Sequence, residues 1–261
     1  MLIDTHSHIH FKKYFPSPDE VIANAEKAGV KGQILVGCDV RDSFTALEIV
    51  KSRPDKKLWC TLGVHPHDSN QLTAGILKKF EQTILEENQN GRKIVAIGEI
   101  GLDYNRNFQS EDIQKNAFFE QLGLAKKLDL TAVIHERDAW DETMEILARA
   151  GNTKVVLHSF SGGLNEAQQC IERGYYISFS GMLTYSKNDH LRDVARIVPL
   201  DKALVETDCP YLPPQQYRGS RNEPAYVVET AKELAKHFDT DYEGICELTT
   251  KNAGECFGID L

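Results

Sequence analysis

The chain has 261 residues and a formal net charge of −9 at pH 7. A protein that grips nucleic acid over a broad surface is usually basic, so this charge excludes broad electrostatic binding of a polyanion. Any attraction to nucleic acid must be local, and bound metal ions would supply it. No apolar stretch is long enough to cross a bilayer, which excludes a membrane-spanning protein.

The N-terminus and the cysteines predict a cytoplasmic protein. The first residues lack a charged region, an apolar region and a cleavage site, so we expect no secretory signal. The six cysteines are scattered without a CxxC pair, which argues against a zinc ribbon or a disulfide framework. Reduced thiols in the cytosol are the simplest account of them.

Short apolar runs recur along the chain, and a helical pattern follows most of them. Most runs are continuous rather than alternating, as expected for parallel strands that are buried on both faces. The predicted strands are Leu2–Ile3, Ile34–Val36, Leu58–Leu62, Ile94–Ile97, Ala132–Ile134, Val155–Leu157, Tyr175–Phe179 and Ala203–Val205.

The segments between these runs carry apolar residues at helical spacing. One begins at Ile113, and another runs from Pro224, a good first helical residue, to Phe238. Strands alternating with helices predict a single-domain (β/α)8 TIM barrel over residues 1–261, a typical length for that fold. The stretch Tyr242–Phe257 predicts one or two extra C-terminal helices. An open doubly wound sheet is the alternative, but no GxGxxG motif follows a strand.

Two histidines end the first predicted strand. His6 and His8 are two residues apart, and a strand projects such side chains to the same face. Two imidazoles placed this way on a rigid strand form a preset pair of metal ligands. Taken alone, they could equally be incidental histidines in a polar turn.

Further candidate ligands follow other predicted strands. Glu99 follows the fourth, His135 the fifth, His158 the sixth and Asp208 the eighth. The chemistry of such barrels lies at the C-terminal ends of the strands, so these residues should converge at one mouth. Alone, Glu99 could cap the next segment, and Asp208, two residues before Pro210, could be a turn residue. The convergence is more specific than any single motif.

These residue types predict a pair of divalent metal ions. Imidazoles with carboxylates suit zinc or manganese, and carboxylates with water suit magnesium. Six protein ligands are too many for one open catalytic site, but they fit two ions with a bridging carboxylate. Two ions about 3.5–4 Å apart can hold a hydroxide and stabilise both oxygens of a displacement at phosphorus. The expected cofactors are therefore two ions of Mg²⁺, Mn²⁺ or Zn²⁺.

Several motifs extend these observations along nearly the whole chain. They are Asp4-Thr5-His6-Ser7-His8, Gly63-Val64-His65-Pro66, Gly98-Glu99-Ile100-Gly101-Leu102-Asp103, His135-Glu136-Arg137-Asp138-Ala139, His158-Ser159-Phe160-Ser161-Gly162, Glu206-Thr207-Asp208 and Arg221-Asn222-Glu223-Pro224. In this order and together, they resemble the TatD family of metal-dependent deoxyribonucleases, within the amidohydrolase superfamily.

The resemblance implies a role for each candidate ligand. It implies that the first ion is bound by His6, His8 and Asp208 and that the second ion is bound by His135 and His158. It also implies that both ions are bridged by Glu99. Catalysis then falls to Glu99 and to Asp208, which orients or deprotonates the attacking water.

Three positions depart from the usual pattern of the family, none of them at a ligand. His10 stands where an acidic or amide residue is common, and Ser159 replaces a frequent cysteine. Cys209 follows Asp208 where serine or alanine is usual. His10 could alter the surroundings of the first ion, and Cys209 could make the site sensitive to oxidation.

Basic and aromatic side chains in the loops at the predicted mouth suit nucleic acid. Guanidinium groups pair with phosphate oxygens, and aromatic faces stack on unpaired bases. The predicted substrate-binding residues are His65, His67, Tyr104, Arg106, Arg137, Phe160, Arg218 and Arg221. The alternative for the basic residues, most of all for Arg221, is that they are ordinary exposed charges without a substrate role. His65 and His67 could instead be structural, because Pro66 fixes a turn between them.

The leading hypothesis is a cytoplasmic deoxyribonuclease that acts as a monomer, with an oligomer as the open alternative. It would hydrolyse phosphodiester bonds from a 3′ end of single-stranded or frayed DNA, through a metal-bound hydroxide. The alternative is a metallohydrolase of acyl or ester bonds, such as an aminoacyl-tRNA deacylase, because the same hydroxide can attack a carbonyl and the fold does not separate the two. A third hypothesis, a non-catalytic, metal-stabilised binding module, is disfavoured by the complete ligand set and the candidate base.

Overall fold

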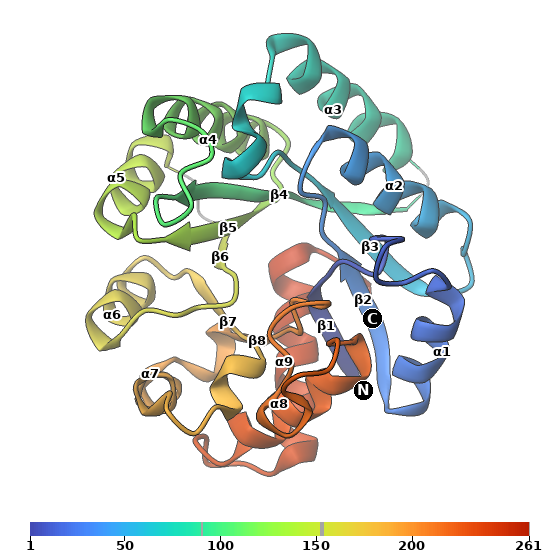
Figure 1. Cartoon of the computed structure of the whole chain (residues 1–261), viewed down its shortest axis with the longest axis vertical. Helices are drawn as coiled ribbons and strands as arrows, with labels where there is room; N and C mark the ends of the chain where they lie inside the picture. The colour runs from blue at the N-terminus through green and yellow to red at the C-terminus, as the bar shows by residue number, and fades with distance from the viewer. Residues whose placement is uncertain (90, 152–153, 261) are drawn as a thin grey trace. The chain divides into compact units, whose positions relative to one another are not determined.

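Eight strands form one sheet in which neighbours follow the order of the sequence (Figure 1). The computed structural model describes residues 1–89, 91–151 and 154–260. The strands are β1 (Leu2–Ser7), β2 (Val30–Leu35), β3 (Lys57–Leu62), β4 (Ile94–Asp103), β5 (Thr131–Arg137), β6 (Val155–Leu157), β7 (Tyr176–Phe179) and β8 (Ala203–Val205). Ser7 pairs with Cys209 just beyond β8, so the chain folds as the predicted (β/α)8 barrel of parallel strands.

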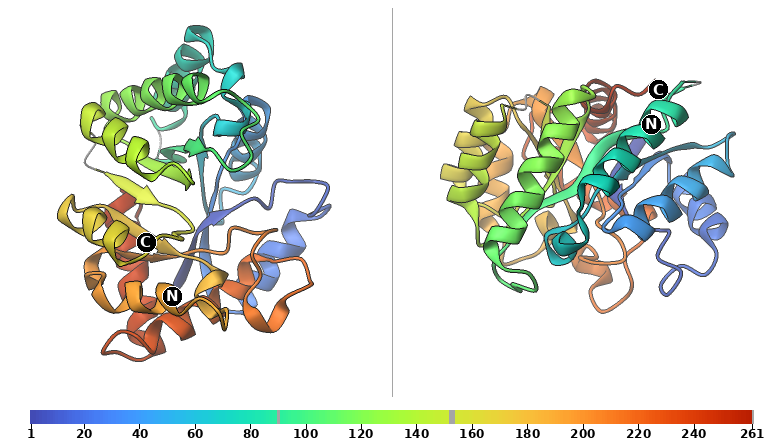
Figure 2. Two further views of the ribbon diagram at one scale, coloured as in Figure 1. Left: turned by 60° about the vertical axis from the view of Figure 1, so that its left-hand side comes forward. Right: turned by 90° about the horizontal axis from the view of Figure 1, so that it is seen from above.

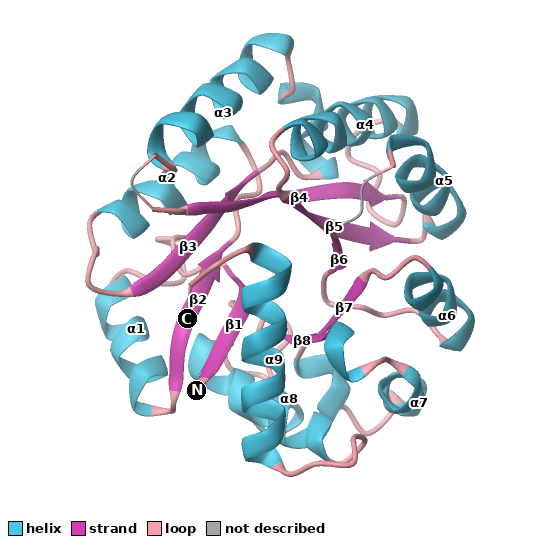
Figure 3. Ribbon diagram, turned by 180° about the vertical axis from the view of Figure 1, so that it is seen from behind, coloured by secondary structure: helices cyan, strands magenta, loops and turns pink. Residues whose placement is uncertain are grey.

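The helices that follow the strands also agree with the predicted alternation. They are α1 (Pro18–Lys27), α2 (Val40–Lys51), α3 (Ala74–Glu87), α4 (Glu111–Lys127), α5 (Trp140–Ala150), α6 (Leu164–Glu172), α7 (Asp189–Ile197), α8 (Val227–Ala235) and α9 (Tyr242–Phe257). The predicted C-terminal extension is the single helix α9, which packs against β1 and β8 (Figure 3). None of the described helices is long and apolar enough to cross a membrane.

The last of the predicted alternating helices begins and ends differently from the sequence pattern. Pro224 opens a short 3-10 turn, Pro224–Tyr226, and α8 starts only at Val227. Phe238 lies beyond the end of α8 and not on its apolar face. The helix ends early because the backbone N–H of Lys236 bonds to the carbonyl of Glu233, a tighter last turn than an α-helix makes.

The chain divides into two compact units. Unit 1 comprises Met1–Leu35 and His158–Leu261, and unit 2 comprises Val36–Leu157. Unit 1 therefore carries β1, β2, β7 and β8, and unit 2 carries β3 to β6. The expectation of a single domain over residues 1–261 stays a prediction.

In unit 1, β1 is buried along its full length although most of its side chains are polar. Asp4 accepts hydrogen bonds from the backbone N–H and the hydroxyl of Thr207, at 2.9 and 2.6 Å. Thr5 donates to the carbonyl of Val205 at 3.0 Å. Buried polar groups cost free energy unless they are paired, so these bonds hold the segment after β8 in a fixed position beside β1.

In unit 2, β4 continues past the point where the sequence predicted its end. The apolar run stops at Ile97, but the strand continues to Asp103 and pairs with β5 up to Arg137. Gly98 and Glu99 interrupt the apolar pattern, and the register of pairing with β5 shifts between Ile97 and Ile100, but the strand does not end there. Glu99 therefore lies within β4 rather than at its end, and His135 likewise lies within β5.

Candidate metal centre

Three potential metal-binding atoms converge in unit 1 at the end of β1. His6 Nε2 lies 3.2 Å from His8 Nε2, and Asp208 Oδ1 lies 3.7 Å from the first and 3.4 Å from the second. Ligands about 2.0–2.2 Å from one ion, at tetrahedral or octahedral angles, are roughly 3–3.5 Å apart. The three atoms therefore have nearly the spacing of ligands around one divalent ion.

Backbone bonds between β1 and the segment after β8 set this spacing. The N–H of Asp208 donates to the carbonyl of His6, and the N–H of His8 donates to that of Cys209, both at 2.9 Å. Asp208 has a φ of +57°, a left-handed conformation that aspartate tolerates better than most residues. The two strand ends thus fix both the backbone and the side chain of Asp208 against the histidine pair.

The charge on Asp208 depends on its surroundings. Burial acts to raise the pKa of Asp208, but its hydrogen bond with His8 and the nearby His6 and His158 outweigh burial and hold it below the usual value. The carboxylate is therefore ionised at neutral pH, as a metal ligand or a base must be.

His158 joins this cluster through a carboxylate to which the sequence analysis gave no role. Its ring stacks on that of His6 with centroids 4.0 Å apart, and its Nδ1 lies 3.2 Å from Glu206 Oε1. The same oxygen accepts a 2.8 Å bond from the N–H of Ser159. A carboxylate at Nδ1 leaves Nε2 of His158 available to a metal, the usual arrangement around ligating histidines.

Glu206 also supports the fit of an ion to unit 1. It is 1% exposed, and its Oε2 has no hydrogen-bond partner among the described residues. The donor atoms of Glu206, His6 and His158 lie within 4.8 Å of one another. A buried carboxylate oxygen without a partner is costly unless a cation or water satisfies it. The donor set of unit 1 therefore fits a divalent ion.

Unit 2 holds a second cluster, centred on Glu99. Its Oε1 lies 2.9 Å from His135 Nδ1 and 3.5 Å from His65 Nε2, and the carboxylate is buried. The thiol of Cys38 donates to Oε2 at 3.6 Å. The donor set of two imidazoles and a carboxylate again suits zinc or manganese. The sequence analysis placed His65 on the substrate side, whereas the structure places it in the Glu99 cluster.

Asp103 contacts His67 and His135 in unit 2 and was also given no role by the sequence analysis. Its Oδ2 lies 2.9 Å from His67 Nε2 and 3.2 Å from His135 Nε2. Burial acts to raise the pKa of Asp103, but the bonds with His135, with the N–H of Arg106 and with His67 hold it well below its usual range. Asp103 is therefore ionised and orients both rings, as Glu206 orients His158 in unit 1.

A glycine allows β4 and β5 to meet at this cluster. Gly101 has a φ of +140°, which L side chains rarely adopt. A Cβ added there would lie 1.9 Å from the carbonyl oxygen of His135, with which Gly101 pairs. Only glycine lets the strands approach closely enough for His135 to reach the carboxylates of β4.

The two unusual positions near the histidine pair are both buried. His10 is 2% exposed, and its ring lies edge-on to that of His8 with centroids 5.8 Å apart. Burial raises the pKa of the Cys209 thiol well above its usual value. Since the thiolate is the reactive form, this disfavours the oxidation that the sequence suggested for Cys209.

The predicted substrate-binding residues of unit 2 differ in exposure. Arg106 and Arg137 are exposed, Tyr104 is half-buried, and His67 meets the exposed ring of Phe108 edge-on with centroids 4.8 Å apart. The side chains of Arg106 and Arg137 are therefore accessible to a ligand. Their substrate roles stay predictions.

In unit 1 the predicted substrate-binding residues also differ in exposure, since one is buried and two are exposed. Phe160 is only 4% exposed, so its face is largely covered. Arg221 donates to the carbonyl of Tyr14 and lies over the ring of Phe15, which gives it a structural contact. Arg218 is exposed and lies over the ring of Tyr185. The substrate roles of these three residues are likewise predictions.

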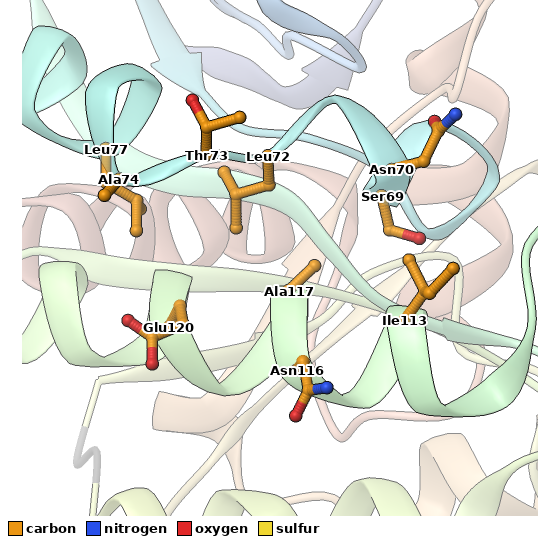
Figure 4. Close-up of a pocket in the computed structure, with 10 residues that line it drawn as sticks. All are labelled: Ser69, Asn70, Leu72, Thr73, Ala74, Leu77, Ile113, Asn116, Ala117 and Glu120. Carbon is orange, nitrogen blue, oxygen red and sulfur yellow. The ribbon is translucent and has the colours of Figure 1, made fainter.

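A hollow of about 460 Å³ in unit 2 contains none of the predicted site residues (Figure 4). It lies between the start of α3 and one side of α4, and half of its lining is aliphatic. The lining residues are Ser69, Asn70, Leu72, Thr73, Ala74, Leu77, Ile113, Asn116, Ala117 and Glu120. No histidine takes part, so this hollow is separate from the metal chemistry of the Glu99 cluster.

The family of the chain follows from a comparison with family models. The model described as "TatD related DNase" matches residues 3–258. The chain belongs to this family. The sequence resemblance to TatD proteins is thereby confirmed, and the chain is a hydrolase of the TatD family whose buried histidine–carboxylate clusters are consistent with metal binding.

Individual TatD relatives cover most or all of the chain. The "Uncharacterized metal-dependent hydrolase YabD" of Bacillus subtilis is 35% identical over 262 residues, covering 100% of both chains. The "3'-5' ssDNA/RNA exonuclease TatD" of Escherichia coli is 36% identical over 248 residues, covering 92% of this chain and 93% of its own. The crystal structure of YjjV, a TatD homologue from Escherichia coli, superposes with a TM-score of 0.90 at 30% identity, over 99% of this chain and 98% of its own.

Proposed function

We propose that this TatD-family hydrolase is a metal-dependent nuclease that removes nucleotides from the 3′ end of single-stranded or frayed DNA. The observation that carries the proposal is the triangle of His6, His8 and Asp208 in a buried site. The Escherichia coli relative named as a 3′–5′ ssDNA/RNA exonuclease supports the substrate, because it matches over nearly its whole length.

The proposed ligand set is the one predicted from the sequence. His6, His8 and Asp208 would hold one ion, and their spacing supports this. His135 would hold the second ion, with its ring fixed by Asp103. His158 as a further ligand of the second ion, and Glu99 as the ligand that both ions share, stay predictions from the sequence.

The residues of the chain have separate tasks in this proposal. When bound, the ions would lower the pKa of a water and neutralise charge on the phosphoryl group. Asp208 is ionised and fixed in position, so it can accept a proton from that water. Glu206 and Asp103 keep the rings of His158 and His135 in place, which would orient them toward the ions.

The test is hydrolysis of end-labelled substrates by metal-loaded protein. We expect single-stranded DNA to be shortened from its 3′ end, blunt duplex DNA to be cut more slowly, and Asp208→Asn to be inactive at equal metal content. The substrate panel includes single-stranded RNA and an aminoacyl-tRNA. Faster loss of the aminoacyl ester than of any phosphodiester would contradict the proposal and favour the deacylase. Loss of neither would favour a binding module.

A further inference from the structure

Two loops of unit 1 enclose a polar hollow of about 410 Å³. One loop joins β7 to α7, and the other joins β8 to α8 and is the long orange loop of Figure 2. The lining side chains are all polar and none is acidic; they are Tyr185, Ser186, Lys187, Asn188, Gln215 and Arg218. Two of them are cationic, so the hollow is positive in a protein whose net charge is −9.

The two cations of the hollow are available to a ligand. The guanidinium carbon of Arg218 lies 4.5 Å from the centre of the Tyr185 ring, which supports its plane. Within the described part of the chain, neither Arg218 nor Lys187 has an ion pair. On α7, by contrast, Arg192 pairs with Asp189 and Arg196 with Asp193. The two cations of the hollow therefore have no carboxylate partner among the described residues, and an anionic ligand bound there would neutralise them.

The walls of the hollow are held together before any ligand arrives. The N–H of Gln215 donates to the hydroxyl of Thr184 at 2.7 Å, and the Tyr185 hydroxyl donates to the carbonyl of Pro213 at 3.0 Å. A Cβ on Gly181 would lie 2.3 Å from the carbonyl oxygen of Leu212, so glycine lets the loops touch. A site fixed in this way loses little conformational entropy on binding.

The same loop connects the hollow to the candidate metal centre. Asp208 stands near its start and Arg218 in its second half. Asn222, which is fully buried, closes the loop by donating to the carbonyls of Thr207 and Tyr211 at 2.8 and 2.6 Å. A ligand held by Arg218 is therefore held by the segment that also positions Asp208.

We propose that this hollow binds a phosphodiester group of the substrate strand other than the one being cleaved. The proposal rests on the nuclease function proposed above. The planar guanidinium of Arg218 suits two phosphate oxygens at once, and Lys187 adds a mobile point charge. Asn188 Nδ2 donates to the carbonyl of Met182 at 3.1 Å, and Gln215 Oε1 accepts from the N–H of Ser186 at 3.4 Å. The amide oxygen of Asn188 and the amide nitrogen of Gln215 remain for the adjoining sugar or base. The hollow thus favours substrates with several linkages over a dinucleotide.

The test compares thymidylates of different length. Arg218→Ala should lower kcat/KM for hexathymidylate about 5- to 10-fold, through KM, as expected for one partly exposed charge-assisted contact. With the dinucleotide, which has only the cleaved linkage, the change should stay below about twofold. Lys187→Ala should act in the same direction and more weakly. Lys251→Ala removes one positive charge from α9 outside the hollow, and it should behave as the wild type.

Neutral methylphosphonate linkages, placed one at a time in the hexamer, identify the group that is bound. At one position other than the cleaved bond, a neutral linkage should lower kcat/KM of the wild type as much as Arg218→Ala does. The same linkage should cause no further loss of kcat/KM in Arg218→Ala, because both changes remove the same contact. Equal losses on the dinucleotide and the hexamer, or full additivity at every position, would overturn the proposal.

Failure of the nuclease function has a separate signature, because the wild type would then cleave no thymidylate of any length. In that case, fluorescence anisotropy with labelled hexathymidylate tests the hollow directly. Binding that is 5- to 10-fold weaker in Arg218→Ala than in Lys251→Ala would support it. Equal binding by the two variants, or none by the wild type, would overturn it.

Discussion

Replacing Glu206 by glutamine should weaken metal binding about tenfold while the fold stays intact. Glu206 Oε1 accepts bonds from His158 Nδ1 at 3.2 Å and from the N–H of Ser159 at 2.8 Å. Glutamine keeps an oxygen for these donors but loses the charge that favours a cation. Carboxylates that orient ligating histidines typically account for about 10–100-fold in metal affinity or activity, and a change that keeps the acceptor belongs at the low end.

Glu206→Ala should be more severe, because both donors lose their acceptor in a site where Glu206 is 1% exposed. We expect about 100-fold weaker metal binding and a free energy of unfolding lower by roughly 1–3 kcal/mol for each buried donor left unpaired. Competition with a chromogenic chelator measures the affinity, and thermal unfolding in excess chelator measures the stability.

Glu255→Gln on α9 is the matched control, since that side chain is 53% exposed. It should bind metal as the wild type does. If Glu206→Gln also binds metal as tightly as the wild type, then Glu206 does not orient a ligand and our account of the unit 1 cluster is wrong.

The remaining predictions concern both units. Glu99→Ala should lower kcat more than His67→Ala at saturating metal, because Glu99 is the proposed shared ligand whereas His67 contacts Asp103; equal losses would mean that Glu99 has no special role. Gly101→Ala should lower the free energy of unfolding by about 4 kcal/mol or more, because its Cβ would meet the His135 carbonyl. Urea unfolding measures this, and a variant as stable as the wild type would contradict the prediction. Log affinity for single-stranded DNA should fall with log salt with a slope of roughly −1.4 to −2.8, for about two to four phosphate contacts at −0.7 each; a much steeper slope would indicate a broad basic surface.

The sequence predicted the strands and the closing helix well because both depend on local patterns. The bounds of Tyr242–Phe257 agree with α9, whose N-cap Asp241 accepts a bond from the N–H of Gly244 at 2.8 Å. Strand ends were less predictable. The sequence analysis ended the fourth strand at Ile97, whereas in the structure Gly98 and Gly101 let β4 continue beside β5.

The carboxylates that orient the histidines were missed because their partners are distant in sequence. Glu206 bonds to His158 across 48 positions, and Asp103 to His135 across 32. Each belongs to a motif of the family resemblance, but a motif does not separate a ligand from the group that orients it. One local signal was present for Asp103, because it shares with Glu99 a spacing that places both on one face of an extended strand.

The acidic net charge and the proposed polyanionic substrate are compatible because of where the basic residues lie. On the helices of unit 1, several cations pair with a carboxylate three positions away, as Lys232 does with Glu229 and Lys236 with Glu233. Such pairs cancel locally and leave little field for a distant phosphate. Arg218 and Lys187 lie on loops, where no helical neighbour three or four residues away neutralises them. An acidic protein can therefore attract a strand at a few chosen points while its overall charge disfavours non-specific binding along a duplex.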